Sequence, residues 1–190
     1  MHPFDNYASD MVLNVHSNAS YLSTPDSRSR AAGYFFLGSV PTTNQPIKLN
    51  GAVNVICSTL KCVSASATKA KLGALFHNAK EAKALRITLN KLGHPQPTTP
   101  VQIHNSTTVG IVNNTIKRRK SRSMEMRYFW LLDGGVQKIF DFLYHPGIEN
   151  LADYPSKYHT GAHHNRIQPY YVHTPNSPRY LIRAAKPSVW

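Results

Sequence analysis

The sequence predicts an α/β fold in which helices flank a mixed, five-stranded sheet. Three successive segments, residues 11–16, 31–40 and 51–60, carry the alternating or β-branched and aromatic pattern of strands. The period then changes, and apolar residues recur at steps of three and four from Ser66 to Leu92, as in an amphipathic helix. A strand meander followed by alternating helices and strands predicts a mixed sheet with helices on its faces.

The later elements are expected to be short. Gly93 and Pro95 end the long helix, Ser106 is the expected N-cap of the next one, and the pair Pro146–Gly147 stops the last strand. The expected elements are a strand at 101–104, a helix at 107–114, a helix at 124–136, a strand at 138–144 and a helix at 148–153. We expect one domain at 11–159, between an N-terminal extension (1–10) and an irregular tail rich in Pro, His and Tyr (160–190).

The charge of the chain is strongly positive. Its 190 residues contain 22 Lys and Arg against 9 Asp and Glu, a net charge of +13, which favours a polyanionic partner such as nucleic acid. Cys57 and Cys62 are too few for a zinc site and would lie on opposite faces of a strand. The start of the chain has no signal-peptide pattern, and no apolar run reaches the ~20 residues of a membrane span. We therefore expect an intracellular protein without a membrane partner, in an unspecified compartment.

Four short motifs stand out by their order and spacing: residues 16–21 (HSNASY), 66–72 (SATKAKL), 101–107 (VQIHNST) and 149–154 (ENLADY). Two further segments accompany them, 28–38 (RSRAAGYFFLG) and 120–130 (KSRSMEMRYFW). Together they resemble the ribonuclease H domain at the end of a copia-type retrotransposon Pol polyprotein, over about residues 12–173. The resemblance implies a ribonuclease H-like fold and an ancestral activity that hydrolyses RNA in RNA–DNA hybrids.

The resemblance also implies one metal-binding acid in each of the four motifs. The corresponding positions here are Asn18, Lys69, His104 and Asp153, so three of the four acids are replaced. Two-metal hydrolysis needs carboxylates to hold two divalent ions beside the scissile phosphate. A lysine among the ligands repels those ions, and Lys71 adds a second positive charge where the family often has another Glu. Asp153 is at most a single remaining metal ligand.

Nucleic-acid contact is expected from two basic groups. A lysine at the altered site can grip a phosphate directly, although drift on a solvated helix edge explains the same residues. The basic run can contact a nucleic-acid backbone, although it can equally be a solvated loop. The candidate contact residues are Lys69, Lys71, Lys117, Arg118, Arg119, Lys120, Arg122 and Arg127. Histidine groups, His16 with His104 and the tail residues His159, His163, His164 and His173, suggest metal sites only by composition.

Three functional hypotheses remain open. The first is a catalytically inactive ribonuclease H-like domain that serves as a basic nucleic-acid-binding or scaffold module in a nucleoprotein assembly. The second is a residual endonuclease that cleaves RNA in RNA–DNA hybrids. The third is a translated retrotransposon remnant without a selected role. No cofactor is expected for the first and third, and Mg²⁺ or Mn²⁺ only for the second.

Overall fold

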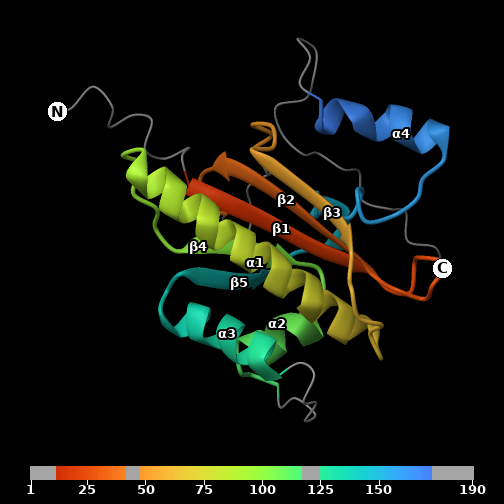
Figure 1. The fold of residues 1–190 in the computed structure, drawn as a ribbon. Coiled ribbons are helices and arrows are strands. Elements are labelled where there is room, and N and C mark those ends of the chain that lie inside the picture. Colours follow the sequence, from red (N-terminus) through yellow and green to blue (C-terminus); the bar gives the residue numbers. More distant parts are fainter. Residues whose placement is uncertain (1–11, 42–47, 117–124, 173–190) are drawn as a thin grey trace.

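Five strands form one mixed sheet in the computed structural model, which describes residues 12–41, 48–116 and 125–172. The strand order is β3-β2-β1-β4-β5, with β1–β2 and β2–β3 antiparallel and β1–β4 and β4–β5 parallel (Figure 1). This confirms the predicted mixed sheet. The strands are β1 (Val12–Ser20), β2 (Arg30–Gly38), β3 (Asn54–Thr59), β4 (Thr99–Ile103) and β5 (Phe140–Tyr144). The helices are α1 (Ala67–Lys91), α2 (Ser106–Val112), α3 (Glu125–Val136) and α4 (Gly161–Ile167), with 3-10 turns η3 (Gly147–Glu149) and η4 (Gln168–Tyr170).

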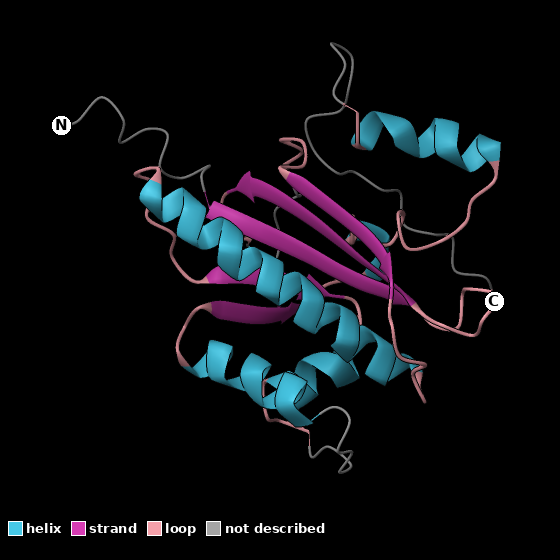
Figure 2. Cartoon of the chain, in the orientation of Figure 1, coloured by secondary structure: helices cyan, strands magenta, loops and turns pink. Residues whose placement is uncertain are grey.

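The long helix α1 lies across one face of the sheet, and α2 and α3 pack beside it near β5 (Figures 1 and 2). β1 is buried on both of its faces, so its alternate side chains serve two different cores. Leu13 and Val15 point into the larger core, where Leu75 and Ala79 of α1 meet them. This central position of β1 fixes the place of every side chain that it carries.

A glycine lets α1 approach the sheet closely. Asn78 donates to Ser17 Oγ at 2.8 Å and to the carbonyl of Ala32 at 2.9 Å, both in the buried interior. A Cβ at Gly33 would lie 2.8 Å from Asn78 Cγ, so only glycine leaves room for this amide. The contacts of Asn78 therefore fix the position of α1 along β1 and β2.

The other face of the sheet is covered by the C-terminal part of the chain. Tyr34 and Phe36 of β2 form a second core with Leu151 and Ala152. Tyr171 adds an edge-to-face contact with Tyr34, at 5.5 Å between ring centroids, and donates to the Leu151 carbonyl at 2.6 Å. The prediction of an irregular tail is thus wrong for 161–170, which form α4 and η4, while 173–190 lie outside the described residues.

Several predicted boundaries differ from the structure. The predicted helix at 148–153 is only the short turn η3, because Asn150 donates to the Ser17 carbonyl and accepts from the Ala152 N–H, which favours turns over a helix. Asn105, not Ser106, caps α2 and accepts from the Thr108 N–H at 2.7 Å. Cys57 lies on β3 and Cys62 lies beyond it, and both are exposed free thiols.

Candidate functional site

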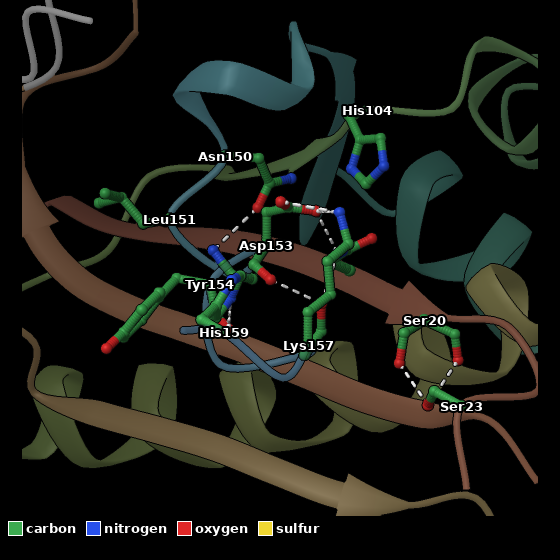
Figure 3. A network of polar contacts seen from close by, with 12 residues as sticks. Ser20, Ser23, His104, Asn150, Leu151, Asp153, Tyr154, Lys157 and His159 are labelled. Atoms are coloured by element: carbon green, nitrogen blue, oxygen red, sulfur yellow. Dashed lines mark hydrogen bonds and ion pairs between the residues drawn. The ribbon is translucent and has the colours of Figure 1, made fainter. Parts of the chain in front are cut away.

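Side chains from β1, α1, the end of β4 and the turn after η3 meet at one end of the sheet. β1 and β4 run in parallel, with Ser17 opposite Ile103. Asn18 comes directly after Ser17 and His104 directly after Ile103, so the two residues lie at the same end of neighbouring strands. Asn18 Nδ2 lies 2.9 Å from Asp153 Oδ1, and Lys71 Nζ lies 2.9 Å from His104 Nε2. Figure 3 shows Asp153 and Lys157 among the polar contacts, with His104 close to them. The structure thus brings together Asn18, His104 and Asp153 of the four predicted positions.

The Asp153 carboxylate is already engaged by neighbouring donors. Its Oδ1 accepts from Asn18 Nδ2, and Lys157 Nζ lies 2.7 Å from Oδ1 and 2.9 Å from Oδ2. Asn18 is buried and also donates to Ser156 Oγ at 2.8 Å. Asn18 and Lys157 therefore both donate to Asp153, the only carboxylate of the network. A flip of the Asn18 amide would place its oxygen against the Asp153 carboxylate.

Lys71, rather than Lys69, is the lysine that enters this network. The two residues are about 200° apart around α1, so they point away from each other. The backbone N–H of Lys69 donates to Ser66 Oγ, the N-cap of the helix. Burial lowers the pKa of Lys71 from its usual value, the Lys157 ammonium acts in the same direction, and the Asp153 carboxylate opposes both. Lys71 is therefore the lysine that joins this network, and the side chain of Lys69 points to another side of α1.

His104 is held neutral beside Lys71. Burial is the main cause of its lowered pKa, the Lys71 ammonium lowers it further, and Asp153 counteracts them. A neutral ring whose Nε2 accepts from the Lys71 ammonium carries its proton on Nδ1. Gly147 leaves space for the ring, because a Cβ there would lie 3.3 Å from His104 Cδ2. The imidazole is consequently a partner of the lysine.

The residues present do not fit a two-metal centre. Mg²⁺ takes oxygen ligands and needs several carboxylates to bring two ions together. Here one ion-paired carboxylate faces the ammonium groups of Lys71 and Lys157, so the charge of the network is positive. Among the described residues, no group of three or more His, Cys, Asp or Glu side chains is placed to hold a metal ion. We derive no hydrolytic step through metal ions here.

The other predicted histidines within the described residues serve packing, while His173 lies outside them. His16 is fully buried, and its Nδ1 accepts from the Leu151 N–H at 2.9 Å. His159 and His163 stack on each other with 4.3 Å between ring centroids, and His159 stacks on Tyr154 at 4.9 Å. His164 forms a hydrogen bond with the Tyr154 hydroxyl. This stacking holds α4 beside the Asp153 turn.

The predicted basic residues are distributed differently. Lys117, Arg118, Arg119, Lys120 and Arg122 lie outside the described residues. Arg127 lies on α3, with its guanidinium 5.7 Å from the centre of the Phe76 ring of α1. It is therefore on the α1–α3 face, apart from the Lys71 network.

Sequence reasoning missed two parts of the network. The link of Asp153 with Lys157 was detectable, because opposite charges four residues apart commonly pair. The contact of Asn18 with Ser156 joins residues 138 positions apart and carried no local signal.

Comparison with known proteins gives one distant relative in sequence. No family model matches the chain. The chain is 25% identical over 149 residues to the retrovirus-related Pol polyprotein from transposon TNT 1-94 of Nicotiana tabacum, which covers 78% of the chain. The chain spans about a tenth (10%) of the length of that relative.

Solved structures share the fold at low sequence identity. LC11-RNase H1 in complex with an RNA/DNA hybrid matches with a TM-score of 0.53 and 10% identity, over 75% of this chain and 91% of that one. The chain has a ribonuclease H-like fold. The N-terminal RNase H domain of rv2228c from Mycobacterium tuberculosis gives a TM-score of 0.50 and 12% identity, over 77% of this chain and 91% of that one. In the described part of this ribonuclease H-like chain, no helix is long and apolar enough to span a bilayer.

Proposed function

We propose that this ribonuclease H-like domain binds the phosphate backbone of nucleic acid without cleaving it, alone or within a nucleoprotein assembly. The observation that carries the proposal is the contact of Lys71 with His104, beside an Asp153 already paired with Lys157. Two-metal hydrolysis requires a cluster of free carboxylates, whereas this network is cationic and its one carboxylate is ion-paired.

Electrostatics argue against hydrolysis at this site. At ~4 Å and an effective dielectric constant of about 20, two unit charges interact by about 4 kcal/mol, so a divalent ion beside Lys71 meets about 8 kcal/mol of repulsion. The Asp153 charge offsets part of that repulsion, but Lys157 is bound to it through both oxygens. A metal ion would have to displace Lys157 and remain beside Lys71.

The same charges favour a phosphate group. Lys71 is half-buried and lies beside a neutral imidazole. Among the described residues, no carboxylate is in hydrogen-bonding contact with its ammonium group. A phosphate oxygen is a strong acceptor for such a group. The net charge of +13 supplies a long-range attraction for the same ligand. The structural neighbour crystallised with an RNA/DNA hybrid makes that duplex the first ligand to try.

The test is hybrid binding measured as a function of salt. Fluorescence anisotropy with a labelled 20-base-pair RNA–DNA hybrid gives the slope of log K against log salt concentration, which falls by about 0.9 for each lost phosphate contact in B-form DNA. We expect Lys71→Met to weaken binding and to reduce the slope by about one. Lys91→Met, at the exposed end of α1, is the control that should leave both unchanged. Absence of binding at low salt, or binding indifferent to salt, would contradict the proposal.

A further inference from the structure

Three cations form a strip on α1 and α3, and Lys61, in the loop after β3, acts on the same histidine as two of them, His77. We define the α1–α3 cation strip as Lys80, Lys83 and Arg127. Its members stand over half-buried aromatic rings: Lys80 Nζ lies 5.8 Å from the centre of Phe76, Arg127 Cζ lies 5.7 Å from the same ring, and Lys83 Nζ lies 5.7 Å from the centre of Trp130.

The rings and the cations follow one another along the two helices. Phe76, Lys80 and Lys83 follow the spacing of one helix stripe, at steps of four and three residues. Phe76 meets Trp130 of α3 edge to face, with 5.4 Å between ring centroids. The aromatic pair therefore joins the two helices and supports cations from both. Each of the two rings has at least one cation over it, so the strip suits a phosphate backbone better than a stacked base.

The acids described on α1 and α3 contact neutral amides rather than members of the strip. Glu81 of α1 accepts from Asn54 Nδ2 at 3.2 Å, and Asp133 of α3 accepts from Gln137 at 2.7 Å. No described carboxylate forms an ion pair with Lys61, Lys80, Lys83 or Arg127.

The effect on a neighbouring histidine shows how closely the cations gather. Burial is the first cause of the lowered pKa of His77, and the charges of Arg127, Lys80 and Lys61 each lower it further. Cations from the loop after β3, from α1 and from α3 therefore act on the same point, which makes this face strongly positive.

The strip lies apart from the Lys71 network. Lys80 is nine residues beyond Lys71 on α1, which places it about 13 Å further along the axis and about 180° around the helix. Because Lys71 points toward His104, Lys80 points to the opposite side. A single phosphate cannot touch both lysines.

We propose that the α1–α3 cation strip is a second nucleic-acid contact surface, which takes the phosphate backbone of a duplex. Lys80 and Lys83 are about 4.5 Å apart along the helix axis, close to the 3.4 Å per charge along one strand of a duplex. The inference rests on the proposed function in one respect, the class of ligand. It adds a binding face that is independent of the altered site.

The experiment compares two triple variants with equal loss of charge. Lys80→Gln/Lys83→Gln/Arg127→Gln removes three members of the strip, and Lys91→Gln/Lys138→Gln/Arg166→Gln is the matched control at exposed positions elsewhere. Circular dichroism first verifies that both fold. With the 20-base-pair hybrid, losing three phosphate contacts should lower the salt slope by about 2.7, so that the wild type loses about 40-fold more affinity than the strip variant between 50 and 200 mM salt. The control should keep the wild-type slope.

The outcomes separate this inference from the proposed function. If the wild type binds the hybrid and both triple variants share its slope, the strip is not a nucleic-acid surface and the proposed function stands. If the wild type does not bind the hybrid, the proposed function is wrong, and the strip loses its proposed ligand with it. Loss of binding to polyglutamate by the strip variant, with hybrid binding intact, would assign the strip to an acidic protein and overturn the inference.

Discussion

Replacing Asp153 by alanine tests whether its carboxylate stabilises the fold. In a cluster of metal-binding acids without metal, like charges repel one another, and removing one acid relieves the repulsion. Here the carboxylate accepts from the buried Asn18 amide at 2.9 Å and pairs with Lys157 at 2.7 Å. The two arrangements therefore predict opposite signs for the same substitution.

The magnitude follows from the contacts that are lost. A hydrogen bond to a charged group contributes about 1.5–3 kcal/mol, and an exposed ion pair contributes about 0.3–0.5 kcal/mol. Asn18 keeps its bond to Ser156, which places the first figure toward its lower end. We expect Asp153→Ala to lower the free energy of unfolding by about 2 kcal/mol, and Lys157→Met, which removes only the half-exposed pair, by less than about 0.5 kcal/mol.

Urea unfolding followed by circular dichroism without divalent ions measures this difference. The m-value should stay constant, so that a shift of the midpoint reports stability alone. Asp133→Ala removes an exposed carboxylate of α3 and serves as the control, with a change within about 0.5 kcal/mol. A rise in the free energy of unfolding with Asp153→Ala would refute the reasoning, because it would reveal a carboxylate held against repulsion.

Three further predictions concern stability. Burial that lowers the pKa of Lys71 disfavours its charged form, so Lys71→Met should leave the unfolding free energy unchanged or raise it while weakening hybrid binding; a clear loss of stability would contradict a binding role. His104 has a lowered pKa when folded, so the unfolded chain binds the proton more readily. Stability should be complete above the ordinary histidine pKa of about 6.5 and fall as the pH decreases below it, and His104→Gln should flatten that fall in urea titrations. Gly33→Ala should destabilise by about 1–3 kcal/mol in thermal unfolding, because its methyl group would lie 2.8 Å from Asn78 Cγ; an unchanged melting temperature would show that the helix can shift freely.

The fold was largely accessible from the sequence because its signals are local. The three- and four-residue recurrence of apolar residues places α1 within a residue or two of its observed ends, Ala67–Lys91. The strand pattern around Tyr34 and Phe36 gives β2, and the switch from strands to helices gives the mixed sheet. The predicted domain boundaries stay a prediction.

The site was less accessible because its contacts join distant residues. The family resemblance implies that Asn18, His104 and Asp153 belong to one site, but choosing between Lys69 and Lys71 requires the rotation of α1 against β4. That rotation is set by tertiary packing, including the Asn78 contact beneath Gly33.

Cleavage of a labelled RNA–DNA hybrid in Mg²⁺ and then Mn²⁺ tests the central claim most directly. The wild type should leave the hybrid intact while binding it. The variant Asn18→Asp/Lys71→Glu/His104→Asp restores three carboxylates beside Asp153, and any cleavage it gains would show that the assay detects a competent site. Metal-dependent cleavage by the wild type that disappears with Asp153→Asn would contradict the account.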